Sequence, residues 1–272
     1  MSLCLHEVTT YKETKCPAFD KHDSFRIQKF AKYWSYYLKK NKNLPIASWF
    51  TLGDDAGIEK GKSTSLLKRG LLKKKEGVSP GGDREAEQDC SVPATGVFLK
   101  CSRKYDHDQS LGHEKNVYSC IISNFNEVPF FVYPIALVSK NYAQRPDSSS
   151  TIDVIVYDWI TQWEKLEGKC DILVLEDCGD LHYDVFLGSV NNFDFWSSVV
   201  QMISALRFMQ REEIVHNDLH LGNIRVVQES FLFDVDALKV VPQKTKGRHV
   251  VRMNKMIKLF DWDRSLSKKI KS

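Results

Sequence analysis

Residues 216–223 include two side chains whose types and spacing suit the transfer of a phosphoryl group. The segment reads His-Asn-Asp-Leu-His-Leu-Gly-Asn, so Asp218 and Asn223 stand five positions apart in a short loop. An Asp in such a loop can orient a hydroxyl group and accept its proton, and an Asn carbonyl can bind a magnesium ion that bridges phosphates. Any one of these residues alone would more often be a cap or a solvated charge. Together, in this order, they predict a phosphotransferase and leave the acceptor open.

The loop resembles the catalytic loop of the protein-kinase-like superfamily, whose usual form is H-R-D-L-x-x-x-x-N. Asn217 stands where that family usually has Arg, and His220 stands where protein kinases usually have Lys. Haspin-like kinases, several kinases of large DNA viruses and the aminoglycoside or choline kinase branch often have His there. The resemblance implies catalytic roles for Asp218 and His220 and a metal-binding role for Asn223.

Other parts of a nucleotide site follow in the order of this family. Lys100 resembles the strand lysine that contacts the α- and β-phosphates of ATP. Glu114, fourteen residues later, resembles the helix glutamate that pairs with this lysine. Residues 173–179 resemble the last strand of the small lobe and the hinge, where backbone groups of Glu176 and Cys178 would hydrogen-bond adenine. The resemblance therefore implies ATP and Mg2+ as cofactors.

Two segments compete to supply the second magnesium ligand, an Asp that directly follows a buried strand. The motif D-W-D at 261–263 stands where the family has D-F-G, which makes Asp261 the ligand and residues 228–256 an inserted strand pair. Asp234 also follows an apolar strand and lies nearer to Asn223 in the sequence. The aromatic residue after Asp261 favours that position, and Asp234 stays open.

A rival phosphate motif lies in the first third of the chain. Residues 56–63 match the loose phosphate-loop pattern [A/G]-x-x-x-x-G-K-[S/T], which makes a P-loop NTPase a second hypothesis. The first Gly of the strict pattern is missing, and residues 65–70 are a poor candidate for the helix that a phosphate loop needs. Alternatively, residues 53–57 are a degenerate glycine-rich flap after a strand-like stretch at 47–52.

Hydrophobic periodicity predicts the helices that position these residues. A helix is expected at 24–40, a short helical stretch at 114–122 and a long helix at 192–211, with Asn192 or Asp194 as the cap of the last. One broad face of the long helix is apolar and is expected to pack on the core. Its members are Phe195, Trp196, Val199, Val200, Ile203, Leu206 and Met209.

Strand patterns and composition predict an α+β chain of four segments. Strands are expected at 95–101, 152–157, 172–175 and 224–227. Half of the fourteen Gly lie between residues 53 and 82, beside a run of Lys and Arg, which indicates a flexible insertion. The segments are an N-terminal helical extension with the first strand (1–52), a flexible Gly/Lys-rich insertion (53–93), a kinase N-lobe (94–178) and a partial kinase C-lobe with the catalytic loop (179–272).

Bulk properties limit the setting and partners of the chain. A net charge of +4 over 272 residues makes nucleic acid an unlikely partner. No apolar run approaches about 20 residues, so no membrane span is expected. The first residues lack the pattern of a signal peptide, and the seven Cys form no C-x-x-C pair, which favours an intracellular protein, cytoplasmic or nuclear.

The resemblance implies a two-lobed protein-kinase-like fold with a truncated C-lobe, because only nine residues follow the D-W-D motif. It implies a serine/threonine protein kinase with a protein substrate, and a possible partner that completes the C-lobe. Two alternatives stay open, a small-molecule kinase and a non-catalytic pseudokinase that acts as a binding module.

Overall fold

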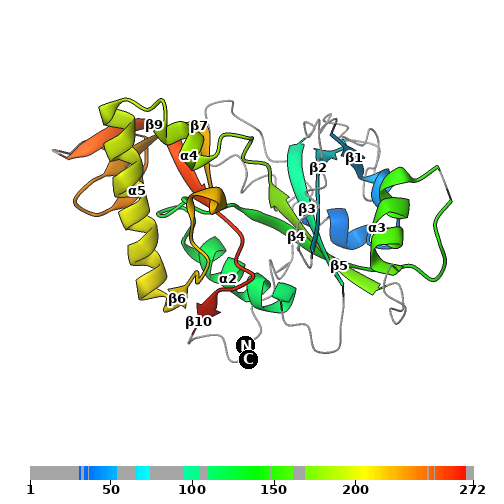
Figure 1. The fold of residues 1–272 in the computed structure, drawn as a ribbon. Helices are drawn as coiled ribbons and strands as arrows, with labels where there is room; N and C mark the ends of the chain where they lie inside the picture. The colour runs from blue at the N-terminus through cyan, green and yellow to red at the C-terminus, as the bar shows by residue number, and fades with distance from the viewer. Residues whose placement is uncertain are drawn as a thin grey trace, which may run out of the picture.

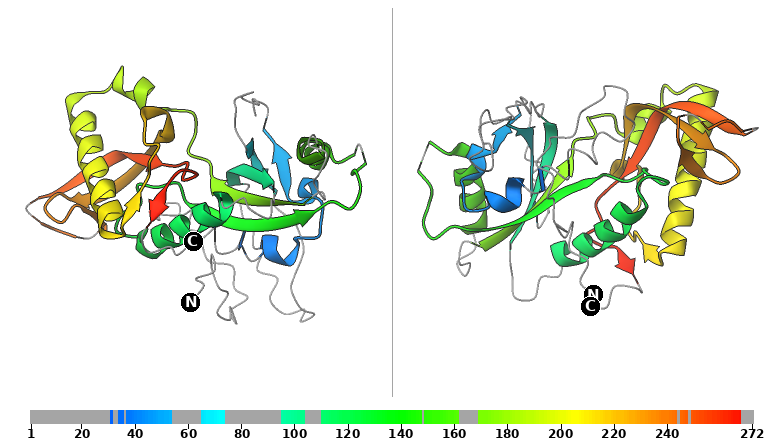
Figure 2. Two further views of the ribbon diagram at one scale, coloured as in Figure 1. Left: turned by 60° about the horizontal axis from the view of Figure 1, so that its bottom comes forward. Right: turned by 180° about the vertical axis from the view of Figure 1, so that it is seen from behind.

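The computed structural model describes residues 31, 34, 35, 37–53, 65–73, 95–103, 110–147, 149–161, 169–243, 245–247 and 249–267. Over these residues the chain is a mixed α+β structure with antiparallel pairing between its named strands. A five-stranded sheet lies at one end and a three-stranded sheet at the other, with α2 (Ser110–Asn124) between the two ends (Figure 1; Figure 2). None of the helices described is long and apolar enough to span a membrane.

The five-stranded sheet has the order β1-β2-β3-β5-β4. Its strands are β1 (Phe50–Leu52), β2 (Ser65–Leu72), β3 (Thr95–Arg103), β4 (Pro134–Asn141) and β5 (Lys169–Glu176). β3 and β5 occupy the middle of the sheet, and the continuous apolar run 172–175 of β5 is buried as expected for a strand covered on both faces. α2 joins β3 to β4. The predicted strands at 95–101 and 172–175 are confirmed, and the helix predicted at 114–122 is confirmed and longer.

Residues 152–157 belong to a helix, α3 (Thr151–Thr161), so the strand predicted there is wrong. The β-branched residues favoured a strand, but burial follows the helical period. The buried residues are Ile152, Asp153, Val156 and Ile160. The Asp153 carboxylate also accepts hydrogen bonds from the backbone N–H groups of Ile46 and Ala47 at 2.9 and 3.0 Å. These bonds tie α3 to the short 3-10 helix η1 (Ile46–Ser48), just before β1.

β2 lies inside the stretch 53–93, so the flexible insertion predicted there is wrong for these eight residues. Lys68 and the residues beside it made the segment look polar, but alternate residues from Leu66 to Leu72 face the core and Lys68 itself is buried. A side chain at Gly70 would collide with β1, because a Cβ there would lie 1.9 Å from the Thr51 carbonyl oxygen. Residues 54–64 and 74–94 lie outside the described residues.

The other end of the molecule contains the long helix and a long hairpin. Its elements are α4 (Tyr183–Leu187), α5 (Asn192–Arg211), β6 (Ile214–Val215), η2 (Leu221–Asn223), β7 (Ile224–Asp234), β8 (Lys239–Val241), β9 (Val250–Leu259) and β10 (Leu266–Ser267). β7 and β9 pair along nearly their whole length, with an irregularity between Gln228 and Phe231. Residues 228–256 therefore contain paired strands, as predicted, and these continue the ladder that begins at Ile224. β10 returns to pair with β6.

α5 has the predicted bounds, but its cap and its buried face differ from the prediction. Asn191 is the cap, and its side-chain oxygen accepts from the N–H of Asp194 at 2.9 Å. The buried face is mostly small or polar: Ser197, Ser198, Gln201, Ser204, Ala205, Phe208 and Met209. Gln201 holds α5 on β9 through hydrogen bonds to the backbone of Lys255 and Ile257. The predicted apolar face is largely exposed, and the Trp196 side chain is 63% exposed.

A buried apolar segment joins the two ends of the molecule. Residues 130–133, between α2 and β4, are all buried. The Leu259 N–H at the end of β9 donates to the Phe130 carbonyl at 2.9 Å, and the Val132 N–H donates to the Leu259 carbonyl at 2.9 Å. The end of β9 is therefore fixed next to the five-stranded sheet. Of the predicted helix 24–40, the described residues from Ala31 onwards are helical, and the remainder lies outside the described residues.

Candidate active site

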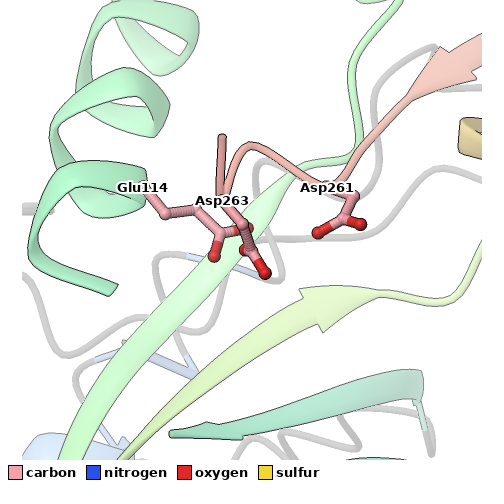
Figure 3. Close-up of side chains that lie close together, drawn as sticks. All are labelled: Glu114, Asp261 and Asp263. Carbon is pink, nitrogen blue, oxygen red and sulfur yellow. The ribbon is translucent and has the colours of Figure 1, made fainter. Parts of the chain in front are cut away.

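Three carboxylates and one ammonium group meet where β3, α2 and the turn after β9 come together. Lys100 Nζ lies 3.0 Å from Glu114 Oε2 and 3.0 Å from Asp261 Oδ1, and it also pairs with Asp263. Glu114 projects from α2, and the two Asp project from the turn after β9 (Figure 3). One ligand oxygen from each of the three acids can be chosen so that all lie within 4.8 Å of one another. The sequence prediction that Lys100 and Glu114 pair is confirmed as a contact.

Among the described residues, one ammonium group pairs with the three carboxylates of this cluster. Burial acts to lower the pKa of Lys100, but the Glu114, Asp263 and Asp261 carboxylates outweigh it and raise that pKa above its ordinary value. Burial raises the pKa of Glu114 to about 7, against the opposing effect of Lys100. Burial also acts to raise the pKa of Asp263, and the attraction of Lys100 leaves it lowered. Three carboxylates facing one ammonium group form a site that attracts a further cation.

Glu114, Asp261 and Asp263 could hold a divalent metal ion. Carboxylate oxygens are the ligands that Mg2+ prefers, and Asp261 and Asp263 are partly exposed, which leaves room for water and phosphate oxygens in the coordination shell. The chemistry of the donor set therefore fits magnesium. Asp261 was expected here from the sequence.

The D-W-D turn is anchored by its central Trp. Trp262 is fully buried, and its ring lies 4.5 Å from the His216 ring and 5.7 Å from the Phe131 ring. His216 Nε2 is hydrogen-bonded to the Phe260 carbonyl at 2.9 Å. Asp261 has a φ of +67°, the left-handed region, and this backbone turn brings its carboxylate to Lys100. The strand before the turn and the Trp after it thus fix one metal-ligand candidate.

The loop 216–223 lies against the same turn. The Phe260 N–H donates to the Asn223 carbonyl at 3.2 Å, so the end of the loop and the start of the D-W-D turn are in contact. The Asn223 side-chain N–H donates to the Asp218 carbonyl at 3.0 Å, which leaves the side-chain oxygen as the atom that could face a cation. Asn217 has a φ of +61°. Asn tolerates this conformation better than Arg does, which gives a structural reason for its departure from the usual H-R-D.

Asp261 and Asp234, the two candidates for the second metal ligand, lie at opposite ends of the hairpin of β7 and β9. Asn223 directly precedes β7, and Asp234 ends that eleven-residue strand. At about 3.3 Å per residue, the two positions are roughly 35 Å apart along the strand. Asp234 instead accepts hydrogen bonds from the N–H groups of Asp236 and Ala237, which form the turn to β8. Only Asp261 of the pair is near the loop.

His220 has a structural contact that its predicted catalytic role did not include. Its Nδ1 accepts a hydrogen bond from the Gly222 N–H at 3.1 Å and thereby caps η2. The close approach requires Gly at 222, because a Cβ there would lie 2.8 Å from the imidazole. The contact holds the imidazole on its own loop.

The residues of the predicted hinge make contacts within the protein that the sequence did not suggest. The Glu176 backbone N–H donates to the Tyr133 carbonyl at 3.0 Å, so it is not available to a base. The Glu176 side chain accepts from Lys258 at 2.9 Å and from the Tyr133 N–H at 2.8 Å, all in the buried interior. Cys178 is buried, and burial raises the pKa of its thiol well above the ordinary value. Lys258 was not expected in this region, and an isolated Lys within an apolar strand was the only sequence signal for it.

The phosphate-loop match at 56–63 falls outside the described residues, but its surroundings are described. The segment that follows it is β2, a strand, where a phosphate loop needs a helix. β1 and β2 pair antiparallel, with Leu52 opposite Gly70, so residues 53–64 connect two strands of a hairpin. This connection lies where the alternative prediction placed a glycine-rich flap.

Two further charged residues of the site were not predicted. Asp263 was noted only as a replacement for Gly, yet it contacts Lys100. Arg264 lies with its Nη1 3.6 Å from Asp218 Oδ1, and its side chain is 71% exposed. The succession Asp-Trp-Asp-Arg was the only sequence signal for these two residues, and the direction of each side chain depends on the left-handed φ of Asp261.

No model of a known protein family matches the chain, and no curated protein matches it either.

Proposed function

We propose that this protein is an ATP- and Mg2+-dependent phosphotransferase with a two-lobed protein-kinase-like arrangement. The observation that carries the proposal is the buried pair of Lys100 on β3 and Glu114 on α2, at 3.0 Å, in contact with Asp261 after β9. In protein kinases a lysine on the third strand contacts the phosphates and pairs with a glutamate on the helix that follows it, and an Asp after a later strand binds magnesium.

The proposed roles follow from what each side chain contacts. Lys100, held by Glu114, would bind the phosphates of ATP. Asp261 and the Asn223 side-chain oxygen would bind magnesium, which neutralises charge on the phosphates and orients them. Asp218, on the partly exposed loop, would orient the acceptor hydroxyl and accept its proton. The acceptor oxygen then bonds to the γ-phosphorus as the bond from that phosphorus to the β,γ-bridging oxygen breaks, and ADP leaves.

The acceptor that we propose is a Ser or Thr hydroxyl of a protein, on the resemblance to haspin-like and large-DNA-virus kinases. A small molecule is the alternative acceptor. The exposed apolar residues of α5, including Phe193, Trp196 and Ile203, support a partner that covers this side of the helix.

The test is phosphoryl transfer from labelled ATP with Mg2+ to a protein mixture. Asp218→Asn should abolish transfer, and Asp261→Asn should abolish it or raise the Mg2+ requirement strongly. Asp234→Asn is the matched control, because it replaces the competing Asp at the far end of β7 and should leave transfer unchanged. Dependence on Lys62 but not on Asp218 would support the P-loop hypothesis instead.

Binding without transfer would identify a pseudokinase. In that case MgATP raises the melting temperature of the wild type, Lys100→Met abolishes this rise, and no labelled product forms with any acceptor. If MgATP neither raises the melting temperature nor is consumed, the phosphotransferase proposal is wrong. The assay therefore separates an enzyme, a nucleotide-binding module and neither.

A further inference from the structure

The turn after β9 places an arginine beside the proposed catalytic base. Arg264 directly follows the D-W-D motif, and its Nη1 lies 3.6 Å from Asp218 Oδ1. This separation is within ion-pair range but too long for a hydrogen bond, so the guanidinium donors are not committed to Asp218. The Arg264 side chain is 71% exposed, while Asp218 is 33% exposed. Among the described residues, the Arg264 guanidinium therefore stands beside Asp218 with no hydrogen-bond acceptor.

The backbone around Arg264 is fixed even though the side chain is exposed. On one side, Trp262 is fully buried. On the other, Ser265 is buried, and both its N–H and its hydroxyl donate to the Trp262 carbonyl, at 3.1 and 2.6 Å. Leu266 then pairs with Val215, which immediately precedes the loop 216–223. The position of the Arg264 Cα relative to Asp218 is therefore set by the fold.

The other groups near Asp218 do not supply this charge. Asn217 is uncharged, and the His220 imidazole accepts the hydrogen bond of Gly222. Lys100 is surrounded by three carboxylates and is buried. Over the described ranges of the chain, Arg264 is the cation that pairs with Asp218.

The chemistry of transfer places a phosphate at this position. Asp218 must contact the acceptor hydroxyl, and that hydroxyl attacks the γ-phosphorus in line with the leaving oxygen. A guanidinium within 4 Å of the Asp218 carboxylate is therefore next to the γ-phosphate oxygens, and its planar fork matches two of them. We propose that Arg264 is a catalytic residue that binds the γ-phosphate of ATP during transfer. This inference rests on the proposed function.

The experiment compares two nucleotides that differ by one phosphate. The affinities of the wild type and of Arg264→Gln are measured for MgADP and for the magnesium complex of a non-hydrolysable ATP analogue. Arg264→Gln should weaken the binding of the ATP analogue about tenfold or more, leave MgADP within about twofold, and lower kcat at least about 100-fold. Arg264→Lys should recover part of the affinity but little of the rate, because an ammonium group cannot form the two-pronged contact. Arg207→Gln, an exposed change on α5, is the matched control and should change none of these values.

A residue that only orients Asp218 would behave differently. In an Asp218→Asn background, a γ-phosphate ligand still distinguishes the ATP analogue from MgADP, so Arg264→Gln should still remove that preference. If Arg264→Gln weakens both nucleotides equally, or neither, or loses its effect when Asp218 is replaced, the assignment of Arg264 is wrong while the proposed function stands. If the wild type binds neither nucleotide, the proposed function fails and the inference with it.

Discussion

The buried carboxyl group of Glu114 should make the stability of this protein fall as pH rises through the neutral range. Its pKa is about 7 in the folded chain and 4.5 ordinarily, mainly because burial disfavours the charged form. The folded chain therefore holds the Glu114 proton at pH values where the unfolded chain has lost it. For a carboxyl whose pKa is raised on folding, the free energy of unfolding decreases between the two pKa values as pH increases.

The size of this effect follows from the same two values. A change of one in pKa corresponds to about 1.4 kcal/mol, so Glu114 should lower the free energy of unfolding by about 3 kcal/mol between pH 4.5 and pH 8. Glu114→Gln keeps the shape of the side chain and removes its titration. Relative to the wild type, the variant should therefore gain most of this 3 kcal/mol between pH 5 and pH 8.

Urea unfolding of both proteins at pH 5 and pH 8, without Mg2+, measures the difference directly. All other titrating groups are shared, so to first order their contributions cancel when the two proteins are subtracted. Asn116→Gln, at an exposed position of the same helix, is the control, and its free energy of unfolding should change between pH 5 and pH 8 as much as that of the wild type does. If the free energies of unfolding of the wild type and of Glu114→Gln change by the same amount between the two pH values, within about 0.5 kcal/mol, the charge state assigned to Glu114 is wrong.

Three further changes test the packing that positions the site. Lys258→Met leaves the buried Glu176 carboxylate without its cation, so it should lower the free energy of unfolding, measured in urea, by about 3–5 kcal/mol. Lys239→Met removes one partner of an exposed pair and should lower the free energy of unfolding by at most about 1 kcal/mol. Equal losses would show that the buried pair is not intact. Trp262→Ala should cost about 3–5 kcal/mol in the same assay, because it empties a fully buried site between two rings, and a loss under 1 kcal/mol would contradict that packing. Asn191→Ala should lower the free energy of unfolding by about 1 kcal/mol through loss of the α5 cap, and Asn191→Ser should restore most of it; an equal loss in both would exclude the cap.

Parts of the site could be predicted because their chemistry requires a fixed order along the chain. Lys100 and Glu114 were paired on their resemblance to the strand lysine and the helix glutamate of protein kinases, and they lie 3.0 Å apart. Asp261 was preferred to Asp234 for the aromatic residue that follows it, and the hairpin separates the two by most of its length. Asp263 could not be given its contact with Lys100, because that contact depends on a left-handed backbone angle that residue types do not reveal.

The long helix shows why its bounds were easier to predict than its orientation. α5 begins and ends where the pattern indicated, because hydrophobic periodicity is a local property, although its cap lies one residue before the predicted position. The choice of its buried face assumed that the most apolar side is covered. Small side chains such as Ser204 and Ala205 are buried instead, and Gln201 bonds to the backbone of β9. The strand predicted at 152–157 was wrong for a related reason, since β-branched residues fit a helix whose partner covers every third or fourth position.

Asn217 and Asp261 have left-handed backbone angles. At such positions the residue that gives the most stable fold should differ from the residue that phosphoryl transfer would require. Each non-glycine residue in this conformation costs about 1–2 kcal/mol that glycine would not, and Asp261 adds a third carboxylate to a crowded cluster. A library of variants sorted only for the amount of folded protein should therefore enrich Gly at 261. A library sorted for phosphoryl transfer should retain Asp there. Under the proposed function, a position where the two enrichments oppose each other identifies a residue that serves phosphoryl transfer and lowers the stability of the fold.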